Sequence, residues 1–169
     1  MDIRLSDSRM MGDNMRKSKF KILTYQNYLS VIKNSQNSKI FRNFYVLNNN
    51  KKRDILKNGQ FSCARYVSSI LKLFDLISET HATVDGTIKD MLKNKWKITK
   101  KLVPGNVLVW GKWVTFSGEI HSHFGFYLGK NKAISHRDEK RIPIIHHYTY
   151  NQKRKIVQIL THKIIQENE

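Results

Sequence analysis

The chain has 169 residues, 40% of them hydrophobic and 11% aromatic, which is enough to bury a core in one globular domain and excludes a largely disordered chain. Its 31 Lys and Arg residues against 13 Asp and Glu give a net charge of +18, which attracts polyanions such as nucleic acid, anionic lipid or anionic cell-wall polymer. The charge is spread along the whole chain, whereas a dedicated nucleic-acid-binding protein more often concentrates it on one element with interleaved aromatic residues.

The N-terminal segment and the single cysteine set the organisation of the chain. Residues 1–18 are polar and aperiodic, which predicts a mobile tail before one domain over residues 19–169. No run is long and apolar enough for a transmembrane helix, and the first residues lack the apolar core of a signal peptide. We therefore expect a chain without a transmembrane segment that is cytoplasmic or exported by a non-classical route. Cys63 has no partner for an internal disulfide.

The first hundred residues are predominantly helical in pattern. The run "KILTYQNYLSVIKNS" predicts an amphipathic helix that ends near residue 36, "IFRNFYVL" a short strand or a helical turn, and "NNNKKRD" a surface loop. The run "SCARYVSSILKLFDLI" has apolar residues three or four apart, which indicates a buried helix whose first turn contains Cys63. In "HATVDGTIKDMLKNKW", Thr83 and Asp85 are candidate caps of a second such helix.

After residue 100 the apolar period changes to two. A Pro-Gly turn leads into the strand of "LVPGNVLVWG", and "VTFSGEIHSHFGFYLG", "KAIS", "IPIIHHYTY" and "KRKIVQILTHKII" follow as β-rich runs separated by polar turns. Helices followed by consecutive strands are typical of the α+β class, so we expect N-terminal helices packed on a C-terminal antiparallel β-sheet.

Cys63 is a candidate nucleophile because of its place at a helix N-terminus. The free amides and the dipole there stabilise a thiolate, which lowers the pKa of a cysteine, and the same amides can hold an oxyanion. The alternative is a small buried residue without a chemical role, and placement alone leaves both open.

The stretch "HSHFGFYLG" contains a candidate base for that nucleophile. In a strand over residues 120–128, the side chains of His121, His123, Gly125 and Tyr127 share one face. A glycine inside a strand indicates that another backbone or a substrate approaches closely. His121 and His123 could instead hold zinc, with further ligands among Cys63, His136, His146 and His147, but no strict zinc spacing is present. We expect no metal and no cofactor, and keep a zinc-dependent hydrolase as an alternative.

Four features in this order resemble one enzyme family: the helix opening with Cys63, the "PGNVLVW" strand, "HFGFYLG" and the polar-ended strand "KAISH". Over about residues 59–140 the chain resembles the NlpC-type papain-like cysteine peptidases and their CHAP amidase relatives. The resemblance implies a papain-like α+β fold and cleavage of amide bonds, commonly in peptidoglycan stem peptides or cross-links.

The resemblance also implies a role for each matching residue. Cys63 looks like the nucleophile and His123 like the general base. The residue that orients the base falls at Ser135, while His136 has the more usual side chain for that role, and strand alternation allows only one of the two to face His123. We favour His136. By analogy, Gln60 could supply an oxyanion donor.

The sequence therefore predicts a cysteine peptidase or amidase, a hydrolase that acts on a peptide or peptidoglycan-like substrate. The alternative is a noncatalytic basic module on the same fold that binds nucleic acid or a cell-wall polymer. Its densest basic run comprises Lys89, Lys93, Lys95, Lys97, Lys100 and Lys101. Acyl transfer in place of hydrolysis and the oligomeric state stay open.

Overall fold

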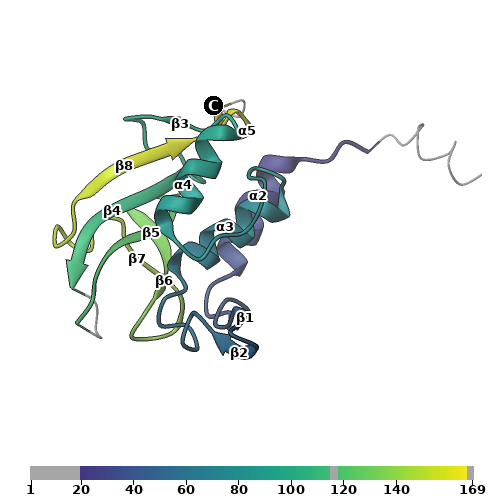
Figure 1. Ribbon diagram of the computed structural model, residues 1–169. Coiled ribbons are helices and arrows are strands. Elements are labelled where there is room, and N and C mark those ends of the chain that lie inside the picture. Colours follow the sequence, from purple (N-terminus) through teal and green to yellow (C-terminus); the bar gives the residue numbers. More distant parts are fainter. Residues whose placement is uncertain (1–19, 115–117, 167–169) are drawn as a thin grey trace, which may run out of the picture.

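The computed structural model describes residues 20–114 and 118–166, which form a mixed α+β fold. Figure 1 shows α2, α3 and α4 gathered on one side of the large sheet. The helices of the described residues are α2 (Thr24–Asn34), α3 (Cys63–Leu73), α4 (Val84–Lys93) and the short α5 (Lys163–Gln166). None of them is long and apolar enough to cross a membrane. The α+β class is thus confirmed, and the tail predicted for residues 1–18 lies outside the described residues.

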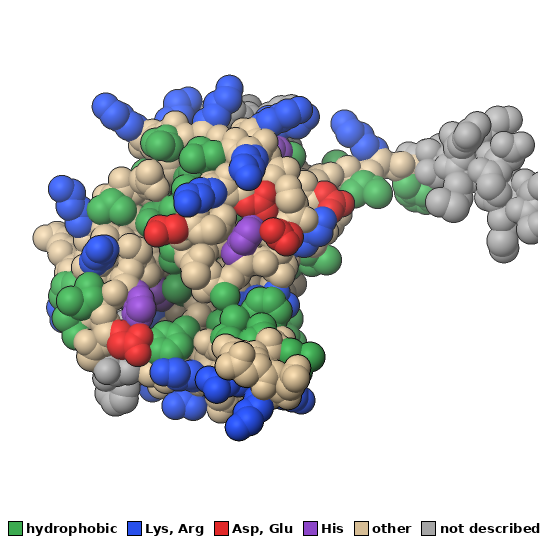
Figure 2. All heavy atoms as spheres, viewed as in Figure 1, with side chains coloured by type: hydrophobic (Ala, Val, Ile, Leu, Met, Phe, Trp, Pro, Cys, Tyr) green, Lys and Arg blue, Asp and Glu red, His purple; other side chains and the backbone are tan. Residues whose placement is uncertain are grey.

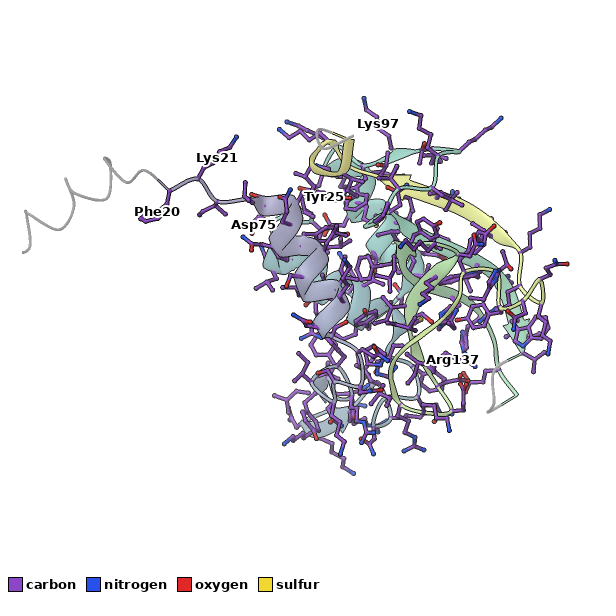
Figure 3. All side chains as sticks on the ribbon, turned by 180° about the vertical axis from the view of Figure 1, so that it is seen from behind. Phe20, Lys21, Tyr25, Asp75, Lys97 and Arg137 are labelled. Atoms are coloured by element: carbon purple, nitrogen blue, oxygen red, sulfur yellow. The ribbon has the colours of Figure 1, made fainter. Side chains whose placement is uncertain are left out.

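The large sheet has six antiparallel strands in the order β3-β8-β4-β5-β6-β7. The strands are β3 (Lys97–Ile98), β4 (Val107–Val114), β5 (Ile120–Gly129), β6 (Lys132–Arg137), β7 (Ile142–His147) and β8 (Ile156–Thr161). Strands β4 to β7 are consecutive neighbours, whereas β8 returns to pair between β3 and β4. In Figure 3, Lys97 on the edge strand β3 lies at the top of the view and Arg137 on β6 lies well below it.

Each face of the sheet has its own apolar cluster, as the alternation along β5 predicts. Phe124 and Phe126 belong to the large core between the sheet and the helices. Tyr127 belongs to a smaller cluster with Trp110 on the other face. The chain after β7 packs across this second face, where the Trp110 indole donates a hydrogen bond of 2.7 Å to the carbonyl oxygen of Tyr148.

Helix α2 is hydrogen-bonded to the turn that precedes β4. The hydroxyl of Tyr28 donates to the carbonyl of Gly105 at 2.8 Å, and the hydroxyl of Tyr25, labelled in Figure 3, donates to that of Pro104 at 2.9 Å. Tyr28 is fully buried, and its ring meets Phe126 of β5 edge-to-face. Helix α2 therefore fixes the Pro-Gly turn against the core.

The surface loop predicted for "NNNKKRD" is partly a strand. β1 (Tyr45–Asn48) and β2 (Lys51–Asp54) form a two-stranded hairpin whose turn residues, Asn49 and Asn50, have φ angles of 50° and 57°. Asparagine tolerates this left-handed conformation, and two such residues make the turn that matches the twist of a hairpin. The polar composition of this run did not predict the hairpin, because both of its strands are largely exposed.

Helix α4 begins as predicted, and its buried carboxylate organises the chain before it. The Thr83 hydroxyl accepts a hydrogen bond from the amide of Gly86, so Thr83 is the cap. Asp90, which is 7% exposed, accepts bonds from the amides of Ser78 and Glu79 and lies 2.8 Å from Nε2 of His81. These bonds hold the segment that leads to the pocket described below.

Candidate active site

A pocket of about 860 Å³ lies where the N-terminus of α3 meets β5 and β6. Its wall includes four residues that the sequence predicted for a site: Gln60, Cys63, His123 and His136. Ser135 is fully buried and lies behind the wall, in contact with His123. The fold therefore brings together segments that are about 60 residues apart in the chain.

Cys63 is the first residue of α3, and its side chain is partly buried. Burial raises the pKa of its thiol to about 11, although the backbone amides of Ala64 and Phe124 and the charge of Arg154 act in the opposite direction. The pairing of β5 with β6 begins only at Gly125, so the edge of β5 beside Phe124 is open to the sulfur. The expected lowering of the Cys63 pKa is wrong for the free protein, because desolvation exceeds what a helix terminus supplies.

His123 faces the side of the sheet away from the helices. Its Nε2 lies 2.9 Å from the hydroxyl oxygen of Ser135, and its ring packs 5.6 Å from the indole of Trp110. Burial holds the pKa of His123 well below its usual value, and the charge of Arg154 adds to the effect. Nδ1 of His123 makes no hydrogen bond with any described residue, including Cys63, although both residues line the same pocket.

The structure places Ser135, and not His136, against His123, which corrects the preference stated above. Ser135 pairs with Gly125 across the two strands, and β6 continues to Arg137 without a bulge in its pairing with β7. Alternation therefore turns His136 to the opposite face. Its ring lies 6.4 Å from that of Tyr66 on α3.

His136 is buried to 1% exposure on the pocket wall, and neither ring nitrogen has a hydrogen-bond partner among the described residues. The pKa of His136 is lowered to about 4, chiefly by burial and also by the charge of Arg42, against a smaller opposite effect of Asp138. His136 is thus a neutral imidazole near pH 7 and has no contact with the His123 ring.

Gly125 lies at a close contact between β5 and β6. A Cβ atom added there would lie 2.4 Å from the carbonyl oxygen of Ile134 and 2.8 Å from Cβ of Ser135. The close approach that the sequence indicated is therefore made by the neighbouring strand. This proximity carries Ser135 to the ring of His123.

Two further residues, His146 and Tyr150, complete the surroundings of Ser135. The Ser135 oxygen lies 2.8 Å from Nε2 of His146 and 2.9 Å from the hydroxyl of Tyr150, and the two rings stack at 4.0 Å. The sequence raised His146 only as a zinc ligand and assigned nothing to Tyr150. In the sequence, the run of His and Tyr residues in "IIHHYTY" is the one feature that points to them. The register that brings β7 beside β6 cannot be predicted from the sequence.

The three contacts of Ser135 determine where the protons lie, since a serine hydroxyl donates one hydrogen bond and accepts two. Nδ1 of His146 lies 2.8 Å from the carbonyl oxygen of His147, which can only accept, so Nδ1 carries a proton. Burial lowers the pKa of His146 to about 4, so its ring is neutral near pH 7 and Nε2 accepts. Ser135 then donates to His146 and accepts from His123 and Tyr150. His123 is therefore protonated on Nε2, and its Nδ1 has the free lone pair that a general base needs.

His121 is separate from this network. It is half-exposed, its Nε2 lies 2.7 Å from the carboxylate of Glu119, and its ring meets Phe61 at 5.7 Å. Within residues 20–114 and 118–166, no group of three or more His, Cys, Asp or Glu side chains is arranged to hold a metal ion.

The basic residues visible in Figure 2 are distributed around that face of the molecule and do not form one continuous patch. The pocket itself contains charges of both signs. Arg137, Lys153 and Arg154 line it together with Glu119, Asp138 and Glu139. The net charge of +18 is therefore spread over the whole chain and is not concentrated at the pocket.

Comparison of the chain with models of known protein families and with curated protein sequences gives no match to either. The likeness to the NlpC-type peptidases accordingly rests on the sequence motifs, and the chemistry of the pocket rests on its own geometry.

Proposed function

We propose that the protein is a papain-like cysteine hydrolase that cleaves amide bonds in peptides or in peptidoglycan stem peptides and cross-links. One observation carries the proposal: a cysteine at a helix N-terminus shares a pocket with a histidine whose Nε2 contacts Ser135 and whose Nδ1 has no hydrogen-bond partner among the described residues. A nucleophile, a base and a group that orients the base are the parts that such a reaction requires. The choice of substrate class comes from the resemblance to the NlpC-type family.

In the proposed reaction, Cys63 forms a bond from sulfur to the carbonyl carbon while its proton passes to Nδ1 of His123. The tetrahedral intermediate collapses as the C–N bond breaks, and the departing amine takes the proton from His123. Water then attacks the thioester carbonyl and gives a proton to Nδ1 of His123. The C–S bond breaks, the Cys63 sulfur takes that proton back, and the acid product leaves. An amine acceptor in place of water would give acyl transfer through the same thioester.

The protonation states of the free protein favour general-base activation over a preformed ion pair. With the pKa of Cys63 raised and that of His123 lowered, both groups are neutral near pH 7. The thiol proton of Cys63 therefore passes to His123 only while the sulfur attacks the substrate, once the bound substrate has brought the sulfur and the imidazole ring into hydrogen-bond reach. The backbone amide of Ala64 is close enough to the sulfur to act on its pKa, and Gln60 lines the same wall, so both are candidate donors to the oxyanion.

The proposal is tested by measuring substrate cleavage and by trapping the acyl-enzyme. The full chain is incubated with purified peptidoglycan and with synthetic stem peptides, and mass spectrometry of rapidly quenched samples follows released fragments and any acyl adduct on the protein. We expect cleavage and an adduct on Cys63, loss of both in Cys63→Ala, and a decrease of at least 100-fold in rate in His123→Ala, since general-base catalysis supplies about 10²–10⁴. Dialysis against EDTA should leave the rate unchanged.

Cleavage by Cys63→Ala at the wild-type rate would refute the proposal, and loss of activity with EDTA would favour a zinc-dependent hydrolase. If no substrate is cleaved while the chain binds nucleic acid or wall polymer with a steep dependence on salt, the noncatalytic basic module is the better description.

A further inference from the structure

Arg154 lies on the pocket wall in the segment between β7 and β8, and its guanidinium packs near two aromatic rings. Its guanidinium carbon is 5.4 Å from the ring centre of Tyr150 and 5.9 Å from that of Trp113. One guanidinium nitrogen donates a long hydrogen bond of 3.4 Å to the carbonyl oxygen of Gly111 on β4. Stacking of this kind fixes the plane of the guanidinium in advance of any ligand.

The charge of Arg154 is incompletely compensated within the described residues. Its Nε atom is buried without a hydrogen-bond partner, and no ion pair of these residues includes it. Two of the acidic side chains on the wall are already engaged, Glu119 with His121 and Glu139 with Arg137. Arg154 therefore has one long hydrogen bond and no ion pair among the described residues while its side chain lines the pocket, and a bound anion would supply the missing charge partner.

Arg154 is also close to the reacting groups. Its charge acts on Cys63, on His123 and on the hydroxyl of Tyr150, which all line the same pocket. A ligand group bound to Arg154 would therefore occupy the same pocket as the bond that Cys63 attacks.

We infer that Arg154 binds a carboxylate of the substrate next to the scissile amide, so that the protein selects peptides with an acidic side chain or a free carboxylate at that position. The planar fork of the guanidinium matches a carboxylate in two parallel hydrogen bonds. A carboxylate is favoured over a phosphate because it carries the single negative charge that one guanidinium balances. The role of this group beside a scissile bond rests on the proposed function, whereas the binding itself does not.

The experiment measures binding in the Cys63→Ala background, where no probe can be cleaved. The probes are the N-methylamides of N-acetylglutamate and N-acetylglutamine, which differ only in a carboxylate against a carboxamide. Dissociation constants come from changes in the ¹H–¹⁵N NMR spectrum during titration. The added substitutions are Arg154→Gln, Arg154→Lys and, as a matched control, Lys155→Gln, which removes the same charge from an exposed neighbour that does not line the pocket.

We expect the carboxylate probe to bind at least tenfold more tightly than the carboxamide, with shifts at pocket residues. Arg154→Gln should abolish this preference, Arg154→Lys should retain part of it with a native spectrum, and Lys155→Gln should change it less than twofold. Equal affinity for the two probes, or an equal loss in Arg154→Gln and Lys155→Gln, would overturn the inference. A retained preference in a protein that cleaves no amide would leave the carboxylate site standing and refute the proposed function alone.

Discussion

Replacement of Gly125 by alanine should separate β6 from β5 and disconnect Ser135 from His123. The new Cβ would be 2.4 Å from the carbonyl oxygen of Ile134, 2.8 Å from Cβ of Ser135 and 3.1 Å from the indole of Trp110. Two of these atoms belong to the backbone or to the root of a side chain, so no rotamer change can relieve the clash. The strands themselves must move.

The size of the movement follows from these distances. Contacts of Cβ atoms shorter than 3.0 Å are essentially never found, so β6 must move back by about 0.6 Å at Ile134. The same displacement extends the contact of 2.9 Å between Ser135 and His123 to about 3.5 Å, which is beyond an effective hydrogen bond. Overpacking of this kind costs about 1–3 kcal/mol in free energy of unfolding.

Urea unfolding measures the stability, and ¹⁵N NMR of the histidine rings reports which nitrogen of His123 carries the proton. We expect Gly125→Ala to lose about 1–3 kcal/mol and the preference of His123 for the Nε2-protonated form. The control is Gly111→Ala on β4, where the added Cβ would meet a side-chain methyl of Val157 at 3.3 Å and should cost less than about 1 kcal/mol. Equal stability of the two variants, or an unchanged His123 ring in Gly125→Ala, would refute the reasoning.

Three further results are expected. His146→Phe keeps a ring against Tyr150 but removes the acceptor for the Ser135 proton. The Ser135 hydroxyl should then donate to Nε2 of His123, and the His123 proton should shift to Nδ1, which ¹⁵N NMR of the histidine rings reports. Tyr148→Phe is the control, and an unchanged His123 ring in His146→Phe would contradict the proton assignment. Because the pKa of Cys63 is about 11, its alkylation by iodoacetamide should accelerate about tenfold per pH unit from pH 7 to 10, and a plateau below pH 8 would show a stabilised thiolate. Asp90→Ala should cost about 2–3 kcal/mol at pH 7, because the Asp90 pKa of about 2 lies below its unfolded value of about 4. This contribution is present above pH 4 and lost as the pH falls to 2, so urea unfolding should show wild type and variant converging there, and a constant difference would contradict it.

Much of the fold and part of the candidate site were readable from local patterns. The stripe of apolar residues after Cys63 and the cap at Thr83 predicted α3 and α4 because both patterns depend only on the geometry of one helix. Strand β1 overlaps the run "IFRNFYVL", for which a short strand was one of two predictions, whereas β2 was missed because an exposed strand has no apolar alternation to detect. The placement of β8 beside β4 depends on which strands meet, and the local pattern contains no information on that.

The sequence by itself determined that a cysteine begins a buried helix and that His123 and Gly125 share one face of a strand, because helix and strand periods act over a few residues. Only the tertiary structure decided that Ser135 faces His123, that His146 and Tyr150 hold Ser135, and that the pKa of the Cys63 thiol rises. Alternation specifies that Ser135 and His136 point to opposite faces, but the register between β5 and β6 selects the one that meets the ring. Burial, likewise, is a property of the assembled molecule, and it reverses the effect that a helix terminus alone would have on the thiol.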